Sequence, residues 1–219
     1  MASWTLKEFC PVFDYLRDPV QIYRRSFELI EQETDLSAVP ADLRDVAIRI
    51  VHATVQPAVI ADLVWTADFV TAAKRALAAG APILADTRMV SDGIIARRLV
   101  ASNPIVCTLY EPQTAEVAKT IGNTRSAAAV DLWGERLAGA VVAIGNAPTA
   151  LFRLLERLRE GAPRPAAILG FPIGFVGAAE SKQALIDADL GIPYITLRGR
   201  IGGSAVAAAA LNALGAEPA

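Results

Sequence analysis

The chain has one histidine, His52, and it lies at the end of an apolar helical pattern. Histidine is the side chain whose reference pKa, ~6.5, lies near neutrality without perturbation, so His52 is the natural candidate for giving or taking a proton. A partly buried, hydrogen-bonded histidine with a structural role fits the same pattern. One histidine cannot supply a multi-histidine zinc site, so we expect no metal centre.

Two glycine-rich loops each follow a short apolar run and open a helix of small residues. The first unit reads AAILG, FPIGFVGAAESK and QALI, and its loop contains Gly174. The second reads PYITL, RGRIGGSA and VAAAALNAL, and its loop contains Gly202 together with Arg198 and Arg200. Backbone N–H groups at helix N-termini favour anions. The pattern therefore predicts a ligand that carries several acidic groups.

Four further polar residues stand next to expected strand ends or helix starts. Asn146 and Thr149 follow a strand and open a helix, which fits either a helix cap or N–H groups that face a ligand. Arg88 follows Asp86 directly after a strand, so a local ion pair is the alternative to ligand binding. Arg125 precedes a helix of small residues, where an ordinary surface arginine is the alternative.

Composition and missing motifs exclude several classes of protein. The formal net charge is −2, which argues against a general nucleic-acid binder. The phosphate loop, the dinucleotide fingerprint and the nucleophile elbow are all missing, which weakens the kinase, dehydrogenase and hydrolase hypotheses. Cys10 and Cys107 are too few for a disulfide framework. No apolar run approaches the ~20 residues of a membrane span, and we expect a cytoplasmic protein without a membrane or nucleic-acid partner.

Short apolar runs alternate with helical patterns from residue 80 onward. The runs have the character of strands buried on both faces of a parallel sheet. The candidate strands are Pro82–Ala85, Ile105–Leu109, Ala140–Gly145, Ala166–Leu169 and Tyr194–Leu197. Helical patterns cover Pro19–Glu33, a segment that starts at Pro40, Phe69–Ala79, Ser91–Leu99, Thr124–Leu137, Pro148–Glu160, Gly177–Ala188 and Ser204–Leu214.

This alternation predicts an α/β fold in one domain, residues 1–219. The expected architecture is a three-layer, doubly wound parallel sheet of about five strands with an N-terminal helical segment. Ligands bind such sheets at the carboxyl ends of the strands, so the loops after the five strands are expected to meet at one edge.

Several long segments resemble the precorrin-8X methylmutase family of the corrin pathway. The matching strings are IYRRSFELI, RIVHAT, APILADTRMV, IGNTRSAAAVDLW, AIGNAPTALFRLLE, PAAILGFPIGFVGAAESKQAL and LRGRIGGSAVAAAALNAL. The resemblance implies a flavodoxin-like fold, a homodimer and no cofactor. It also implies an isomerase that moves a methyl group between adjacent ring carbons, converting precorrin-8X to hydrogenobyrinate, or cobalt-precorrin-8 to cobyrinate.

The resemblance further assigns roles to individual residues. The family's catalytic histidine falls on His52, which would protonate or hydrogen-bond a ring nitrogen. Ser26 and Arg125 occupy positions that the family places around the macrocycle. Four arginines and the helix N-termini would anchor substrate carboxylates; these arginines are Arg88, Arg125, Arg198 and Arg200. Apolar loop residues would cover the ring or serve as core or dimer contacts; they are Phe171, Ile173, Phe175 and Val176.

Two other functions fit the same features. A non-catalytic tetrapyrrole carrier would use the same polyanion site and would not depend on His52 for turnover. A flavin or nucleotide protein of similar fold is disfavoured by the missing phosphate motifs.

Overall fold

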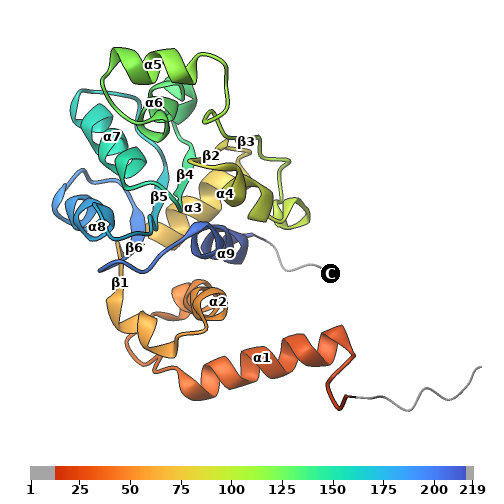
Figure 1. Cartoon of the computed structure of the whole chain (residues 1–219). Helices are drawn as coiled ribbons and strands as arrows, with labels where there is room; N and C mark the ends of the chain where they lie inside the picture. The colour runs from red at the N-terminus through yellow and green to blue at the C-terminus, as the bar shows by residue number, and fades with distance from the viewer. Residues whose placement is uncertain (1–12, 216–219) are drawn as a thin grey trace, which may run out of the picture.

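A six-stranded sheet crosses the protein in the computed structural model, which describes residues 13–215 (Figure 1). The strands are β1 Leu63–Trp65, β2 Ile83–Ala85, β3 Ile105–Val106, β4 Val141–Ile144, β5 Ala167–Gly170 and β6 Tyr194–Leu197. Strands β2 to β6 are parallel, and each coincides with one of the five strands predicted from the sequence. Cys10 lies outside the described residues.

The order of the strands is that of a flavodoxin-like fold. Across the sheet the order is β1-β6-β5-β4-β2-β3. The parallel strands, numbered among themselves, therefore run 2-1-3-4-5, with the switch point between β2 and β4. Strand β1 was not predicted, and it pairs antiparallel to β6 at the edge, with Leu63 opposite Leu197. The predicted fold class is confirmed. The structure adds one antiparallel strand, β1, at the edge of the predicted parallel sheet.

Helices cover both faces of the sheet. They are α3 Phe69–Ala78, α4 Arg88–Gly93, α5 Thr114–Thr120, α6 Arg125–Asp131, α7 Pro148–Arg159, α8 Ala178–Asp187 and α9 Ser204–Leu214, and two further helices, α1 Pro19–Glu33 and α2 Arg44–Thr54, precede them. Alternate strand residues face opposite layers, because side chains alternate along a strand. Ile83 and Ala85 pack with α3, α4 and α9, whereas Leu84 packs with α6 and α7.

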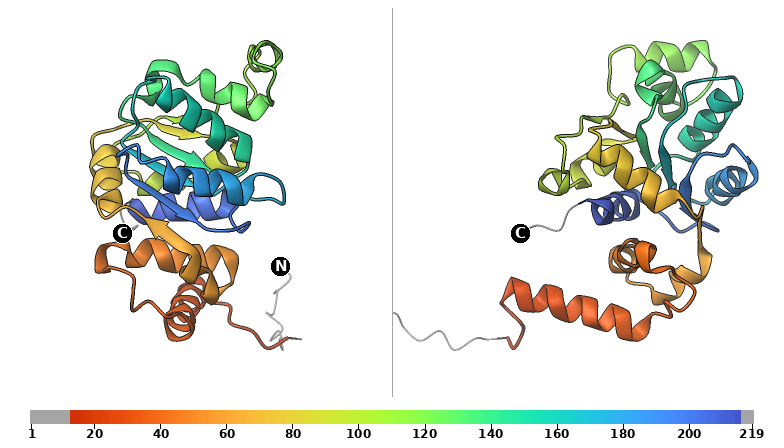
Figure 2. Two further views of the ribbon diagram at one scale, coloured as in Figure 1. Left: turned by 90° about the vertical axis from the view of Figure 1, so that its left-hand side faces the viewer. Right: turned by 180° about the vertical axis from the view of Figure 1, so that it is seen from behind.

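The N-terminal helical segment lies outside these three layers. Helix α2 packs on α9 rather than on the sheet, and α1 packs on α2. Figure 2 shows both helices beyond the α9 side of the sheet in each view. The Asp18 side chain accepts hydrogen bonds from the backbone N–H groups of Val20 and Gln21, which caps α1 at its predicted start. No residue of α1 is buried, although its length exceeds four turns.

Two predicted helices differ in extent. The helix expected over Ser91–Leu99 is instead α4, which starts at Arg88 and ends at Gly93, where the Asn212 amide donates to the Gly93 carbonyl and accepts from the Ile95 N–H. The helix expected over Thr124–Leu137 ends at Asp131, before Gly134 at φ +52°. A tertiary contact and a glycine conformation therefore override the local helical pattern.

Among residues 13–215, no helix has both the length and the apolar character required to span a bilayer.

Candidate active site

His52 stands in the last turn of α2, exposed to solvent and hydrogen-bonded to α1. Its Nδ1 lies 3.2 Å from Oγ of Ser26. The ring of Phe27 lies 5.3 Å from the imidazole, centroid to centroid. Because His52 is exposed, the interpretation of a partly buried histidine is wrong, although its hydrogen bond is present.

A cavity of about 260 Å³ opens beside this pair. Its lining comprises Ser26, Leu29, Ile30, Glu33, Val51, His52, Val55 and Pro57. With Nδ1 facing Ser26, the opposite ring nitrogen, Nε2, is the one left for a ligand. An imidazole held in this way can donate a proton or a strong hydrogen bond to a group that enters the cavity.

A second cavity, of about 390 Å³, joins the last turn of α2 to the two glycine-rich loops. Its lining comprises Ala53, Thr54, Gln56, Ile173, Gly174, Phe175, Arg200, Ile201, Gly202, Ala205 and Val206. Three predicted binding residues, Gly174, Arg200 and Gly202, therefore meet here. The Arg200 guanidinium lies 5.3 Å from the centre of the exposed Phe175 ring. The cavity combines positive charge with apolar surface next to the helix that carries His52.

The two glycine-rich loops touch along their backbones. The N–H of Gly203 donates to the Phe171 carbonyl at 2.8 Å. A Cβ on Gly202 would lie 2.3 Å from that same carbonyl oxygen, so only glycine fits. Phe171 is fully buried and is a core residue, whereas Phe175 and Val176 are more than four-fifths exposed.

Asp86 lies at the switch point of the sheet, the position where flavodoxin-like folds receive ligands. Its buried carboxylate accepts backbone hydrogen bonds from Gly145, Asn146 and Ala147 at 2.8–2.9 Å, directly before α7. Burial raises the pKa of Asp86, and the three N–H groups lower it in part. A side-chain carboxylate thus occupies the switch point between β2 and β4, where an external phosphate would otherwise bind.

This arrangement corrects two of the alternatives considered for the sequence. Asn146 does not cap α7: Ala147 is the N-cap residue, and the Asn146 side chain is exposed. Arg88 is not paired with Asp86 among the described ion pairs; its guanidinium lies 4.6 Å from the centre of the Tyr110 ring. Asp86 was predicted only as an ion-pair partner of Arg88, but in the structure it accepts the three backbone hydrogen bonds that precede α7. A carboxylate directly after a buried strand at the switch point is the sequence signal for it.

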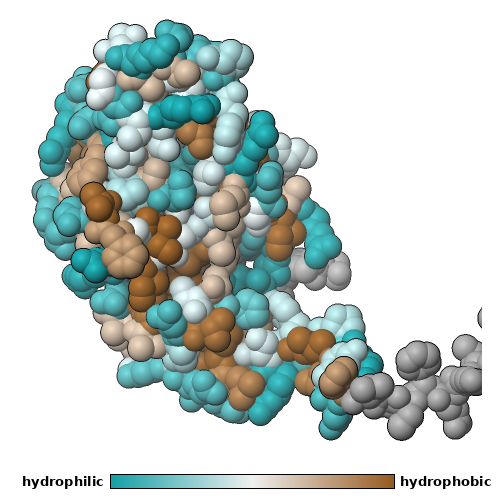
Figure 3. Space-filling model, viewed as in Figure 1, coloured by the Kyte–Doolittle hydropathy of each residue, from teal (hydrophilic) through white to brown (hydrophobic). Residues whose placement is uncertain are grey.

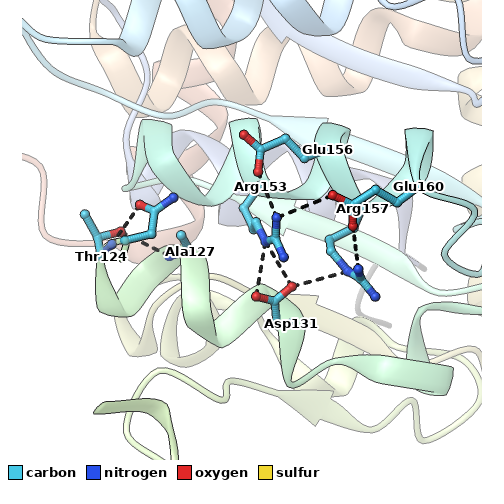
Figure 4. A network of polar contacts seen from close by, with 8 residues as sticks. Thr124, Ala127, Asp131, Arg153, Glu156, Arg157 and Glu160 are labelled. Atoms are coloured by element: carbon cyan, nitrogen blue, oxygen red, sulfur yellow. Dashed lines mark hydrogen bonds and ion pairs between the residues drawn. The ribbon is translucent and has the colours of Figure 1, made fainter. Parts of the chain in front are cut away.

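Arg125 and Thr149 lie at the starts of two helices that are linked to each other. The hydroxyl groups of Thr124 and Thr149 are 2.8 Å apart, and Arg125 donates to the Leu109 carbonyl. Figure 4 shows the rest of the link between α6 and α7, in which Asp131 accepts from Arg153 and pairs with Arg157.

The remaining predicted residues lie outside the two cavities described above. Arg198 is exposed, and its backbone N–H donates to the Asp62 carbonyl at 2.8 Å. None of the other four lines either cavity; they are Arg88, Arg125, Asn146 and Thr149. The structure therefore brings Ser26 and His52 together at one cavity. It brings Gly174, Arg200 and Gly202 together at the other, and the last turn of α2 borders both cavities.

Comparison with known proteins identifies the family. The family model of precorrin-8X methylmutase matches residues 21–217, nearly the whole chain. The chain belongs to the precorrin-8X methylmutase family.

Individual members of the family are similar to this chain along almost their full length. A precorrin-8X methylmutase of Sinorhizobium sp is 57% identical over 93% of this chain and 97% of the relative. A cobalt-precorrin-8 methylmutase of Methanothermobacter thermautotrophicus is 39% identical over 89% of this chain and 91% of the relative. The crystal structure of a precorrin-8X methyl mutase from Thermus thermophilus matches with a TM-score of 0.80 and 39% identity, over 89% of this chain and 94% of that one. The resemblance predicted from the sequence is confirmed.

Proposed function

We propose that this protein is an isomerase of cobalamin biosynthesis that moves a methyl group between adjacent ring carbons of precorrin-8X, giving hydrogenobyrinate. The observation that carries the proposal is the exposed imidazole of His52, held by Ser26 at the mouth of a cavity. Membership of the methylmutase family supports the reaction class.

His52 acts as the proton or hydrogen-bond donor to a ring nitrogen of the substrate. Protonation makes the conjugated ring system electron-poor, which lowers the barrier to methyl migration. Positioned general acid catalysis contributes ~10²–10⁴-fold to a rate. The rest of the acceleration comes from holding the planar substrate in one orientation. Ser26 leaves Nε2 facing the substrate because it engages Nδ1.

Positive charge and backbone N–H groups at the sheet edge hold the substrate carboxylates. Arg200 and the N–H groups near Gly174 and Gly202 anchor those that reach the second cavity. Other predicted binding residues serve carboxylates further along the edge; they are Arg88, Arg125, Asn146, Thr149 and Arg198. The exposed side chains of Ile173, Phe175 and Val176 cover the apolar face of the ring.

The metal-free substrate is favoured over its cobalt counterpart. The relative named for precorrin-8X is 57% identical to this chain, whereas the one named for the cobalt form is 39% identical. A flavin or nucleotide function is disfavoured because Asp86 already accepts the N–H groups that a phosphate would need.

A homodimer is the proposed working form. The fifteen-residue helix α1 packs mainly on α2 and has no fully buried residue, and isolated helices of this length are marginal in water. Val20 and Phe175 are exposed, at 74% and 83%. Figure 3 shows hydrophobic side chains on the face that carries α1 and α2. Light scattering tests this directly: a particle of twice the 23.1 kDa chain mass supports the dimer, and a monomer contradicts it.

Parallel incubation with precorrin-8X and with cobalt-precorrin-8, followed by absorbance, tests the reaction. We expect a spectral change to the corrin product that is faster with the metal-free substrate. Binding of either compound without conversion would identify a carrier and contradict the isomerase. A flavin spectrum in the purified protein would contradict both.

A further inference from the structure

Lys182, in α8, is a lysine with no solvent-accessible side-chain surface. The ion pairs found among residues 13–215 do not include it. Burying an ammonium group is unfavourable unless the group makes compensating contacts. Within residues 13–215, the one hydrogen bond that its Nζ donates is to the Ile201 carbonyl, at 2.5 Å. The ammonium group of Lys182 therefore hydrogen-bonds to the backbone of the second glycine-rich loop.

Ile201 lies between two residues that line the second cavity, Arg200 and Gly202. Among the described residues, Lys182 is the only side chain that hydrogen-bonds to the backbone of residues 199–203. Glycine occupies three of those five positions, so the loop backbone has little intrinsic preference for one conformation.

Backbone contacts hold the same loop from its other side. The Gly203 N–H donates to Phe171, and the Gly174 N–H reaches the Arg200 carbonyl at 3.5 Å. The packing of Gly202 on the Phe171 carbonyl leaves no room for a shift in that direction. Lys182 and the first glycine-rich loop thus hold residues 199–203 between them.

We propose that Lys182 is a positioning residue that sets the place of Arg200 and Gly202 at the substrate cavity by holding the Ile201 carbonyl. This inference rests on the proposed function. Lys182 does not line the cavity, so it acts through the loop rather than on the substrate. Its loss is expected to weaken substrate binding and to leave the proton donation by His52 intact.

Steady-state kinetics of three variants test this role. Lys182→Met keeps the length and removes the donor, Lys182→Gln keeps an N–H donor, and Leu185→Met is a matched buried change on the same helix. We expect Lys182→Met to raise KM at least tenfold with kcat within threefold of wild type. Lys182→Gln should give an intermediate KM, and Leu185→Met should match wild type.

Hydrogen exchange of the amides of residues 199–203 gives a readout that needs no substrate. We expect faster exchange in Lys182→Met and wild-type exchange in Leu185→Met. A KM within twofold of wild type, or unchanged loop exchange, in a folded Lys182→Met overturns the inference. If Lys182→Met does not fold, the same two criteria apply to Lys182→Gln. A wild-type protein that converts no substrate refutes the proposed function instead, and the exchange data still decide the role of Lys182.

Discussion

The proposed chemistry depends on a contact between two side chains, Ser26 and His52, from neighbouring helices. Their 3.2 Å hydrogen bond fixes one ring nitrogen and leaves the other for the substrate. Both side chains border the same cavity. Orientation of an acid–base group by a second side chain is a general feature of such sites, because the donor must meet the substrate at hydrogen-bond distance.

Replacement of Ser26 tests this orientation. Ser26→Ala should lower kcat by ~2–10-fold, which corresponds to the ~0.5–1.5 kcal/mol of one hydrogen bond. KM should change little, because Ser26 touches His52 rather than holding a carboxylate. Steady-state kinetics with precorrin-8X measure both. An unchanged kcat in a folded variant would show that His52 needs no partner.

Replacement of Arg200 tests the anchoring of substrate carboxylates. Arg200→Ala should weaken substrate binding ~10–100-fold, because a charge-assisted hydrogen bond contributes ~1.5–3 kcal/mol. Arg198→Ala is the matched comparison, two residues away and outside the cavity lining. It should also weaken binding, by less than Arg200→Ala, with little effect on folding. Titration followed by absorbance measures both affinities, and equal affinity in wild type and Arg200→Ala would remove Arg200 from the site.

At the scale of elements, Asp86 connects two strands and a helix. Its carboxylate follows β2 and accepts three N–H groups between β4 and α7. These groups would otherwise be unpaired at a helix N-terminus. The contact pairs the N–H groups that precede α7 and links the ends of β2 and β4 at the switch point of the sheet.

Asp86→Asn should therefore destabilise the fold. An amide presents an N–H₂ group toward N–H donors, so at least one of the three loses its acceptor, at a cost of ~1–3 kcal/mol. Urea unfolding measures the loss. Asp187→Asn, an exposed change near the end of α8, should leave stability within ~0.5 kcal/mol of wild type. Equal stabilities for the two variants would contradict the role of Asp86.

The elements with strong local signals were predictable from the sequence. Buried strands bounded by Gly, Pro or Asn appear where expected, and Asp18 with Pro19 begins α1. Strand β1 was missed because three residues carry no periodicity, and its place is set by pairing with β6. The early end of α4 was missed because Asn212, far along the chain, binds the backbone there.

The candidate site was predictable only in part. Residue types and the family resemblance pointed to His52 and Ser26, but their contact depends on how α1 packs on α2. Topology placed Gly174 and Gly202 at one sheet edge, as expected from the carboxyl ends of parallel strands. Nothing local distinguishes Lys182 from an exposed lysine, because its burial follows from tertiary packing.

For the whole molecule, the candidate site has two parts: one cavity lies between α1 and α2, and the other lies between the end of α2 and the glycine-rich loops of the α/β layers. Both cavities use residues of α2, and one also uses α1. Figure 1 shows these two helices below α9, outside the three layers. In the proposed function, the N-terminal segment supplies the acid–base group, and the loops at the sheet edge bind the substrate carboxylates.

The free energy of unfolding should depend on pH because Lys182 is buried in the folded protein. Burial lowers the pKa of Lys182 from 10.5 to about 8. Between these values the unfolded chain holds a proton that the folded chain has lost, so stability should rise with pH across this window. The rise should be at most about 3.5 kcal/mol, at ~1.4 kcal/mol per pKa unit. Urea unfolding of wild type and Lys182→Met from pH 7 to 10.5 measures the difference, and a constant difference would contradict this cost.

The most direct measurement of the central claim separates binding from conversion in His52→Ala. Precorrin-8X is titrated into wild type and variant, and its conversion is then followed by absorbance under single-turnover conditions. The account predicts substrate affinity within about threefold of wild type and conversion slower by ~10²–10⁴-fold. Conversion at the wild-type rate by His52→Ala would contradict the assignment of His52 as the proton donor.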